Sequence, residues 1–388
     1  MRIGIDARFY GSLGKGLGRY TEKLIAQLEV LDQENEYVIF LCRKNYAEYQ
    51  PKNPRFSKVL AHYVWYSLAE QLLFSVLLYR FNFDLVHFPH FNVPILYRRR
   101  FIVTIHDLIL LQYPTLRNTT RGALWYHFKY FCYRAVIASA IARADHILTV
   151  SHFTESDIIN HYPQAKEKIT VTYEAADPFC QILPPQATRG LFDRLGLLRN
   201  SETTPMSQMH RDILKPYLLY VGNAYPHKNL EILLLVAKNF PEYLFVLVGK
   251  DDYFYTRLRV KFEQAGIQNV IFAGFVPENE LSSLYRFATL YIFPSLYEGF
   301  GLPPLEAMAR GLPVLSSRSG SLPEILGDAA WYFDGRDAVS FTQAIGTLMA
   351  ETTLRATLVA TGYARVATFS FRAMASATHT VYKEIFQK

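Results

Sequence analysis

The stretch from Tyr291 to Gly311 reads Y-I-F-P-S-L-Y-E-G-F-G-L-P-P-L-E-A-M-A-R-G, and the interpretation of the whole chain starts from it. A short apolar strand ends at Pro294, and a Gly-Phe-Gly turn then leads into a helix that begins at Pro303–Pro304. Proline suits a first helical turn because its missing N–H would have had no partner there. Gly311 suits the left-handed residue that ends many helices. The pattern therefore predicts a strand, a turn and a helix in succession.

Two carboxylates frame this turn, with Glu298 before it and Glu306 in the predicted first turn of the helix. The free amides and the positive end of a helix can bind an anion or a set of hydroxyl groups. The glutamates supply hydrogen-bond acceptors for such hydroxyls. A glutamate early in a helix often only complements the dipole, but that explanation leaves Glu298 and the glycines unaccounted for. The stretch is therefore predicted to bind a polar ligand.

With seven residues between its two glutamates, the stretch resembles the E-x7-E signature of family 4 of the glycosyltransferases. The resemblance implies retaining enzymes that use nucleotide sugars and have the GT-B fold. That fold consists of two Rossmann-like α/β domains with parallel sheets that face a central cleft. The resemblance covers nearly the full length, and it rests mainly on E-x7-E, on P-H-K-N-L at 226–230 and on two strand-end loops.

Apolar, strand-like runs alternate with helical patterns from one end of the chain to the other. Strands interleaved with helices form parallel sheets covered on both faces, and the pattern restarts near Tyr217. We expect an N-terminal domain at 1–180, a linker at 181–214, a C-terminal domain at 215–370 and a helix at 371–388. In the family that the chain resembles, this last helix crosses back to the first domain. The predicted strands span 3–7, 37–41, 85–88, 101–106, 146–150, 169–173, 217–221, 244–248, 270–273, 291–293, 314–316 and 330–333.

Composition favours a globular chain in a reducing compartment. The 388 residues, 50% of them hydrophobic, are more than one ordinary core needs. Three widely spaced cysteines provide neither a disulfide framework nor a metal-ligand cluster, so we expect a cytoplasmic protein without metal or cofactor. The first residues resemble a strand rather than a secretory segment. The apolar run from Leu72 to Tyr79 is shorter than the ~18 residues that a membrane span needs.

The positive charge is concentrated in one segment. The segment from Arg80 to Arg143 contains nine lysines and arginines but only two acids, so it alone carries a charge of +7, equal to the net charge of the chain. Interspersed aromatic residues make two explanations possible, namely a binding face or solvated charges above a buried aromatic stripe. Nucleic acid is not expected because no nucleic-acid fold signature accompanies the charge. We expect peripheral contact with an anionic membrane, at the inner face of the cell membrane. The aromatic residues are Trp125, Tyr126, Phe128, Tyr130 and Phe131.

A glycine-rich loop follows the first predicted strand, in D-A-R-F-Y-G-S-L-G-K-G-L-G-R-Y at 6–20. Glycines let the backbone approach a ligand closely. A dinucleotide fingerprint would begin directly after the strand, whereas here residues 6–10 intervene, which counts against a dehydrogenase. In the family that the chain resembles, this loop lies near the donor phosphates and the acceptor. The resemblance thus assigns Gly16 and Gly18 to donor binding.

Histidines stand at two strand ends. His106, in T-I-H-D-L, would be structural on residue type alone, since a lone histidine usually is. The resembling family has a histidine at this strand end that contacts the donor sugar, which favours a role for His106. Asp107 is expected to cap the following turn. His87 and His90 are weaker candidates for the acceptor side.

The second domain opens with Y-L-L-Y-V-G-N-A-Y-P-H-K-N-L at 217–230, which predicts a strand, a glycine, a loop and a helix. Lys228 is expected at the helix N-terminus, where an ammonium and free amides can hold a diphosphate. The family typically has an arginine just after the glycine, where this chain has Asn223. Either an asparagine hydrogen bond suffices, or another basic residue such as Arg8 or Arg19 substitutes, or activity is weak.

The resemblance implies a role for each candidate residue. Lys228 holds the diphosphate, Glu306 the ribose hydroxyls and Glu298 the sugar, which His106 approaches from the first domain. The predicted catalytic residues are His106, Lys228 and Glu298. The predicted donor-binding residues are Gly16, Gly18, Gly222, Asn223, Lys228, Val276, Glu298, Gly299, Phe300, Gly301, Leu302 and Glu306.

The predicted reaction moves a hexose, with mannose from GDP-mannose slightly favoured, to a glycan, lipid-linked or polysaccharide acceptor. The anomeric configuration is retained. A GT-B sugar-nucleotide epimerase and a non-catalytic nucleotide-sugar binding subunit are alternatives. No single residue names the sugar, the base or the acceptor.

Overall fold

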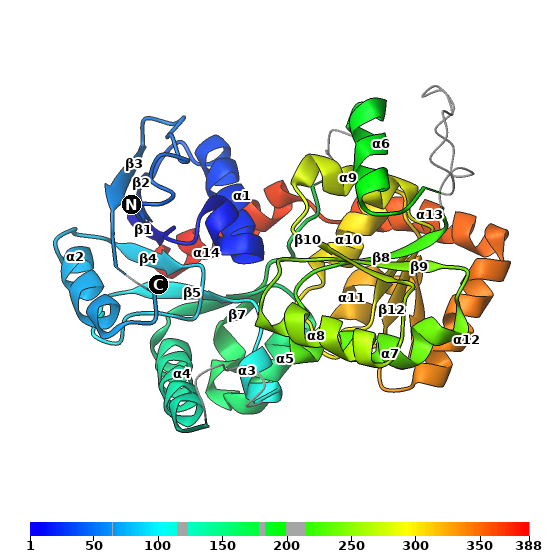
Figure 1. The fold of residues 1–388 in the computed structure, drawn as a ribbon. Coiled ribbons are helices and arrows are strands. Elements are labelled where there is room, and N and C mark those ends of the chain that lie inside the picture. The colour runs from blue at the N-terminus through cyan, green and yellow to red at the C-terminus, as the bar shows by residue number, and fades with distance from the viewer. Residues whose placement is uncertain (64, 115–122, 178–182, 199–214, 388) are drawn as a thin grey trace. The chain divides into compact units, whose positions relative to one another are not determined.

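The computed structural model describes residues 1–387 except 64, 115–122, 178–182 and 199–214, and of residues 12, 13, 15 and 123–126 it describes only the backbone. The chain divides into two compact units. Unit 1 comprises Met1–Ala175 together with Phe369–Lys388, and unit 2 comprises Ala176–Thr368. Each unit is built on one parallel sheet with helices around it (Figure 1).

Unit 1 contains a seven-stranded parallel sheet in the order β3-β2-β1-β4-β5-β6-β7. The strands are β1 (Arg2–Asp6), β2 (Glu36–Leu41), β3 (Phe56–Leu60), β4 (Leu85–Phe88), β5 (Phe101–Ile105), β6 (His146–Thr149) and β7 (Ile169–Val171). The prediction missed β3, an edge strand of sequence F-S-K-V-L in which only Phe56 is buried. Edge strands often carry lysine and lack a continuous apolar run, so their pattern is weak.

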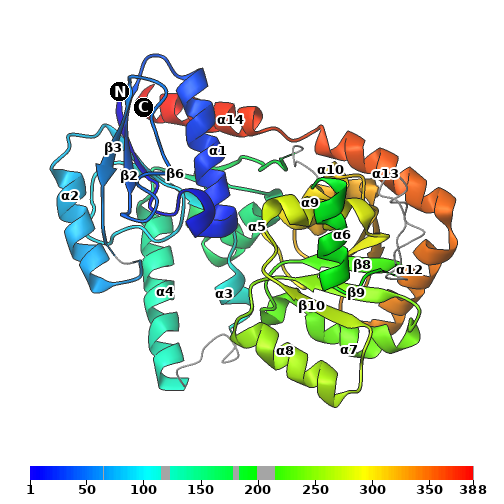
Figure 2. The ribbon, with the colours of Figure 1, turned by 45° about the horizontal axis from the view of Figure 1, so that its top comes forward.

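Helices cover both faces of the unit 1 sheet. They are η1 (Gly11–Gly14), α1 (Lys15–Leu31), η2 (Glu70–Phe74), α2 (Ser75–Tyr79), α3 (Ile109–Gln112), α4 (Ala123–Arg143), α5 (His152–His161), η4 (Pro163–Lys168) and α14 (Phe371–Gln387). The C-terminal helix α14 packs beside α1 (Figure 2), and Leu24 and Val381 belong to one core cluster there. Phe74, Ile137 and Ile158 form the core under η2, α4 and α5.

Unit 2 contains a six-stranded parallel sheet in the order β10-β9-β8-β11-β12-β13. The strands are β8 (Tyr217–Val221), β9 (Leu244–Val248), β10 (Val270–Gly274), β11 (Leu290–Phe293), β12 (Val314–Ser317) and β13 (Ala330–Phe333). Each lies within a residue of its predicted position. The two parallel, helix-covered sheets confirm the predicted fold class.

The helices of unit 2 include one that the sequence pattern did not predict. They are α6 (Pro185–Arg194), η7 (Pro226–Lys228), η8 (Leu230–Ile232), α7 (Leu233–Val236), η9 (Ala237–Asn239), α8 (Tyr253–Gln264), α9 (Glu278–Phe287), α10 (Leu302–Ala309), α11 (Leu322–Leu326), η10 (Gly327–Ala329), α12 (Ala338–Ala350) and α13 (Thr352–Val366). Helix α6 lies within the predicted linker 181–214 and packs on α9 through Phe192 and Phe287. Residues 199–214 lie outside the described part of the chain.

No helix among the described residues is both long enough and apolar enough to cross a membrane.

Candidate active site

The E-x7-E stretch follows β11, an inner strand of the unit 2 sheet. Helix α10 begins at Leu302, one residue earlier than predicted, because Gly301 caps it in a left-handed conformation with φ 96°. A Cβ on Gly301 would lie 2.6 Å from Leu322 Cδ2, so the turn needs glycine. Glu306 is therefore the fifth helical residue, and its predicted place in the first turn was wrong. The second-turn position weakens the explanation of Glu306 as a partner of the helix dipole.

The other end of α10 matches the prediction. Gly311 has φ 69°, and its N–H donates to Met308 O at 3.0 Å. The N–H of Leu312 donates to Ala307 O, also at 3.0 Å. These two bonds define a Schellman motif, in which the left-handed residue satisfies the last carbonyls of the helix.

Lys228 and Glu298 meet because they follow neighbouring strands, β8 and β11. Lys228 Nζ lies 2.6 Å from Glu298 Oε1, and the two side chains are only 11% and 9% exposed. The Ser295 hydroxyl donates to the same carboxylate oxygen. The ammonium also lies 5.2 Å from the centroid of the Phe293 ring. The carboxyl edge of the sheet thus carries a cation and a carboxylate in direct contact.

The turn that carries Lys228 differs from the predicted helix start. Lys228 ends η7, a single 3₁₀ turn, and Asn229 then adopts a left-handed conformation with φ 58°. The Asn229 amide donates to Pro294 O at 3.2 Å and to Gly335 O at 2.7 Å. This residue interrupts the helix, so Lys228 does not lie at the N-terminus of a regular helix. The expectation that free amides of a helix N-terminus surround Lys228 was therefore wrong.

Gly222 and Asn223 form the first turn after β8. A Cβ on Gly222 would lie 2.6 Å from Tyr220 Oη, so packing alone requires glycine at this position. The Tyr220 hydroxyl donates to Asn223 O at 2.7 Å, and Asn223 Oδ1 accepts from Tyr225 N at 3.2 Å. The Asn223 oxygen thus closes a turn. Arg8 is no substitute for the family arginine, since its side chain is completely buried and paired with acids in unit 1.

The loop after β12 contributes a residue that the sequence pattern did not single out. Gly320 has φ 60°, and a Cβ there would lie 2.8 Å from Glu298 N and 2.9 Å from Glu298 O. Ser321 N donates to Glu298 O at 3.2 Å. The loop therefore fixes the backbone of Glu298. Its signal was S-G-S-L-P at the carboxyl end of the next strand of the sheet.

The remaining predicted donor residues differ in their exposure. Phe300 and Val276 are buried, and Leu302 is half-buried. Pro277 caps α9, while the neighbouring Phe275 is 76% exposed. The Phe275 side chain, rather than that of Val276, is therefore the accessible side chain of this predicted donor-binding loop.

His106 follows β5 in unit 1 and has acceptors on both ring nitrogens. Nδ1 lies 3.0 Å from Glu174 Oε1, and Nε2 lies 3.0 Å from Pro89 O. A carboxylate and a carbonyl only accept, so the two contacts together favour the protonated ring, which can donate from both nitrogens. Burial lowers the pKa of His106, but the hydrogen bond and charge of Glu174 outweigh it and raise the pKa above 6.5. Glu174 was not predicted, because an acid shortly after a short strand is a weak signal.

Replacing Glu174 by glutamine should lower the pKa of His106, because the amide keeps the shape but removes the charge. A histidine with a raised pKa stabilises the fold fully below its ordinary value of 6.5 and loses that effect as the pH rises through the folded-state pKa. The variant should therefore lose stability mainly at acidic pH. NMR titration of ¹⁵N-labelled histidines, with urea unfolding at several pH values, measures both effects. An unchanged titration midpoint for His106 would contradict the assignment.

Gly16 and Gly18 both lie in the first turn of α1, which begins at Lys15. A Cβ on Gly18 would lie 2.1 Å from Gly11 O, so close packing accounts for this glycine. A Cβ on Gly16 would meet nothing within 4 Å. Packing therefore leaves Gly16 unexplained, which is compatible with a ligand near this turn.

His87 and Asp107 each have hydrogen-bond partners that account for their positions. His87 is buried, with Nδ1 2.7 Å from the Tyr382 hydroxyl and Nε2 2.8 Å from Thr104 Oγ1. Its predicted place on the acceptor side was therefore wrong, since it joins β4 to α14 and β5. Asp107 Oδ1 accepts from Ile109 N at 3.0 Å, which confirms its capping role.

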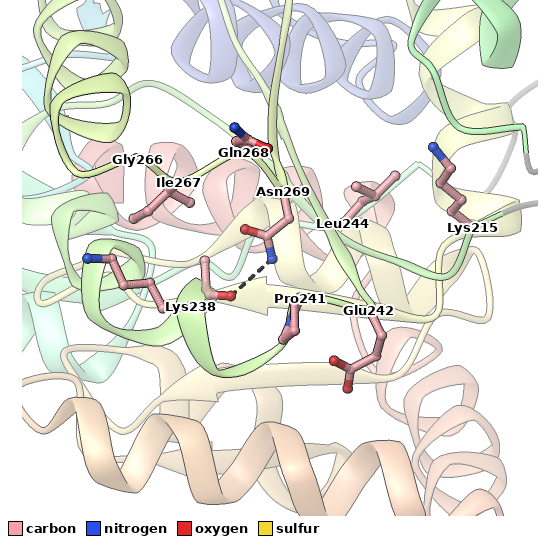
Figure 3. Close-up of a pocket in the computed structure, with 10 residues that line it drawn as sticks. Lys215, Lys238, Pro241, Glu242, Leu244, Gly266, Ile267, Gln268 and Asn269 are labelled. Carbon is pink, nitrogen blue, oxygen red and sulfur yellow. Dashed lines mark hydrogen bonds between the residues drawn. The ribbon is translucent and has the colours of Figure 1, made fainter.

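A hollow on unit 2 lies away from these residues (Figure 3). It lies at the amino ends of β9 and β10. The loops of Lys228 and Glu298 follow the carboxyl ends of β8 and β11, which form the opposite edge of the same parallel sheet. The Asn269 amide in it already donates to Ala237 O at 3.0 Å and to Phe240 O at 2.9 Å. This hollow is therefore not part of the site. Among the described residues, no group of three or more His, Cys, Asp or Glu could hold a metal ion.

Comparison with known proteins identifies both halves of the chain. Residues 209–365 match the family model for glycosyl transferases group 1. Residues 14–178 match the model for glycosyltransferase family 4.

Curated relatives of similar length carry the same kind of description. The chain is 26% identical to the O-antigen chain mannosyltransferase B of Escherichia coli, over 95% of this chain and 96% of the relative. It is also 26% identical to the O-antigen chain mannosyltransferase RfbU of Salmonella typhimurium, over 86% and 87% of the two chains. Neither relative favours the epimerase or the non-catalytic subunit.

The fold is also found in solved structures. One is the Anabaena protein HepE in complex with UDP-glucose, with a TM-score of 0.73 and 17% identity over 99% of this chain and all of that one. The two family models, the full-length relatives and this fold agree with one another. The chain therefore belongs to the family 4 glycosyltransferases of GT-B fold and transfers a hexose from a nucleotide sugar.

Proposed function

We propose that the protein moves mannose from a nucleotide-mannose, with GDP-mannose slightly favoured, to a growing glycan or lipid-linked acceptor, with retention at the anomeric carbon. The bond between that carbon and the diphosphate oxygen breaks, and the nucleoside diphosphate leaves with the electron pair. The oxygen of an acceptor hydroxyl takes its place, and that hydroxyl loses its proton. The choice of mannose is supported by the descriptions of the two relatives.

The observation that carries the proposal is the contact between Lys228 and Glu298. Lys228 is predicted to bind the diphosphate of the donor, and Glu298 is predicted to bind its sugar. Their side chains lie 2.6 Å apart on the loops after β8 and β11. Ligands of open parallel sheets bind beyond the carboxyl ends of the strands. The Lys228 ammonium would stabilise the negative charge that develops on the departing diphosphate, an electrostatic effect worth a few kcal/mol. The Glu298 carboxylate would accept hydrogen bonds from sugar hydroxyls.

The assignments of Glu306 and His106 also belong to this proposal. Glu306 would accept hydrogen bonds from the ribose hydroxyls one helical turn beyond the start of α10. His106 would donate a hydrogen bond to the sugar through Nε2, which requires its present bond to Pro89 O to exchange for the ligand. The hydrogen bond and charge of Glu174 raise the pKa of His106 and so favour the protonated ring that this donation uses.

Nucleotide release should depend on the acceptor and not on a divalent metal. The assay incubates GDP-mannose, UDP-glucose and related donors with α-linked mannooligosaccharides and with lipid-linked glycans, and it quantifies free nucleotide and product. We expect release only with acceptor present and at the same rate in EDTA, since Lys228 and backbone amides are the candidates to neutralise the diphosphate. Donor conversion without acceptor would favour the epimerase. Activity that vanishes in EDTA and returns with Mg²⁺ or Mn²⁺ would contradict the metal-free site.

A peripheral contact with an anionic membrane is the second part of the proposal. The helical segment that contains η2 and α2 exposes four apolar side chains, Leu68, Leu72, Leu73 and Val76, at 51% or more. Helix α4 exposes Phe128 and Phe131, so the alternative of a buried aromatic stripe fails for these two rings. The side chains of Trp125 and Tyr126 lie outside the described residues. Among the described residues, exposed cations of this segment include Arg80, Arg98, Arg99, Lys129 and Arg134.

Vesicle co-sedimentation should show adsorption to anionic but not to neutral lipid. Each lysine or arginine near an anionic surface contributes about 1 kcal/mol, so four such residues give binding that weakens as salt is added. The double variant Leu72→Glu/Val76→Glu should abolish it. Leu235→Glu, at a leucine of α7 in unit 2 that is 66% exposed, is the control. Equal adsorption of wild type to both lipids would leave the charge as a solvated face.

A further inference from the structure

Tyr66 has an unusual backbone conformation for an aromatic residue. Its φ is 59°, and apart from Asn229 it is the one non-glycine among the described residues with positive φ. A bulky residue in this region is strained, and such strain persists only where surrounding contacts hold it. The ring is nevertheless 63% exposed, so packing of the side chain does not account for the conformation.

A buried carboxylate holds the Tyr66 backbone. Glu70 Oε2 accepts from Tyr66 N at 2.6 Å and from Asn92 Nδ2 at 2.8 Å. Glu70 Oε1 lies 2.7 Å from Arg8 Nη2, and neither side chain is exposed. Arg8 in turn pairs with Asp6 at 2.7 Å. A chain of buried charges that begins at the end of β1 therefore fixes the position of one surface tyrosine.

Other aromatic rings from neighbouring loops lie behind Tyr66. The Trp65 ring stacks on Phe9 with centroids 4.2 Å apart and an interplanar angle of 11°. The His90 ring lies 5.1 Å from Phe9 and 6.1 Å from Tyr66. These residues follow β1, β3 and β4, so the group lies at the carboxyl edge of the unit 1 sheet. Within the described part of the chain, the Trp65 indole N–H has no acceptor.

The chemistry of this edge suits a sugar ring. One face of a pyranose consists of C–H bonds, which pack on the electron-rich face of an exposed aromatic ring such as that of Tyr66. The carboxyl edge of a parallel sheet is also where ligands bind. Of the residues assigned to the donor, His106, Gly16 and Gly18 lie in unit 1 and the others in unit 2. None of the aromatic residues of this edge has such an assignment, which makes them candidates for the acceptor.

We propose that Tyr66 packs against a sugar of the glycan acceptor, and that Glu70 is a positioning residue that holds Tyr66 for this contact. The inference rests on the proposed mannosyl transfer and names the acceptor side of that reaction. A lipid chain at Tyr66 would instead show as lost vesicle adsorption in Tyr66→Gly, and the donor base at Tyr66 as a raised donor KM.

Two substitutions separate the ring from the backbone. Glycine adopts positive φ without strain, so Tyr66→Gly removes the ring and leaves the loop conformation accessible. Tyr66→Phe keeps the ring and removes only the hydroxyl. With α-mannotriose as acceptor, Tyr66→Gly should raise the acceptor KM about tenfold and leave the donor KM unchanged, whereas Tyr66→Phe should resemble wild type. Phe386→Ala, at an exposed ring of α14 in the same unit, is the control.

The role of Glu70 is tested through Tyr66. The two oxygens of Glu70 now accept from three donors, whereas a glutamine side chain has only one oxygen. The hydrogen bond from Tyr66 N should therefore weaken in Glu70→Gln. Glu70→Gln should therefore raise the acceptor KM in the wild-type background and have no further effect on it in Tyr66→Gly, whereas we expect it to destabilise both proteins. Additive effects of the two substitutions on KM would show that Glu70 acts on the structure in general.

Further outcomes decide between this inference and the proposed function. An active wild type whose acceptor KM is unchanged by Tyr66→Gly overturns the inference and leaves the function intact. A raised donor KM in Tyr66→Gly would assign the ring to the base, and lost vesicle adsorption would assign it to lipid. If wild type transfers to no mannose acceptor, the proposed function fails. Saturation-transfer NMR with α-mannotriose then tests the contact itself, and absence of transfer to the sugar C–H protons overturns it.

Discussion

Replacing Lys228 by alanine, or Glu306 by glutamine, should weaken donor binding by roughly one to two decades while the protein still folds. A charged hydrogen bond contributes about 1.5–3 kcal/mol, which corresponds to that change in Kd. Calorimetric titration with GDP-mannose measures it. Lys238→Ala is the control, because this exposed lysine follows the same strand but borders the hollow at the opposite edge of unit 2. Unchanged affinity in both site variants would contradict the assignment.

The Lys228→Ala variant also removes the ion pair between Lys228 and Glu298. Without the ammonium, the Glu298 carboxylate is buried with the Ser295 hydroxyl as its remaining side-chain donor among the described residues, which should lower the stability of unit 2. The double variant Lys228→Ala/Glu298→Gln carries no unpaired charge. It should therefore regain stability in urea unfolding but not donor affinity. Recovery of both would mean that Lys228 acts only on the fold.

Gly320→Ala should reduce turnover roughly a hundredfold, since small displacements of catalytic groups have effects of this size. The new Cβ would lie within 3 Å of Glu298 N and O, so the backbone of Glu298 must move. The left-handed backbone of Gly320 adds strain of about 1–3 kcal/mol. Steady-state kinetics and thermal unfolding measure the two effects.

The matched control for this variant is Gly346→Ala in α12. A Cβ there would meet nothing within 4 Å, and alanine favours a helix interior by about 0.5–1 kcal/mol over glycine. This variant should be fully active and slightly more stable. Full activity in Gly320→Ala would show that the loop after β12 does not position Glu298.

The fold was largely predictable from the sequence because its strands are continuous apolar runs. Twelve predicted strands are present, whereas β3 has no such run and was missed. The fold class and the transferase family were likewise confirmed. Local geometry was less predictable, as the left-handed Asn229 and Gly301 show, since they displaced Lys228 and Glu306 from their expected places in the helices.

Contacts between distant residues could not be read from sequence spacing. Glu174 meets His106 across 68 positions, and Gly320 meets Glu298 only because β11 and β12 are neighbours. For Arg8, contacts with distant residues removed a candidate instead of adding one. Its sequence position suggested a ligand, and its burial against Asp6 and Glu70 became apparent only in three dimensions. The assignment of individual residues to the donor stays a prediction that the variants above test.

The position of α14 has a consequence for synthesis on the ribosome. Unit 1 contains residues 1–175, yet Tyr382 of α14 is buried in its core and bonded to His87. While unit 2 is being translated, one apolar face of the unit 1 sheet lacks its second helix. Chains emerge from the N-terminus and domains generally fold as units, so unit 2 should complete its fold before unit 1 does. An N-terminal fragment expressed alone would expose this face, and a chimera of two such enzymes should exchange 371–387 together with 1–175.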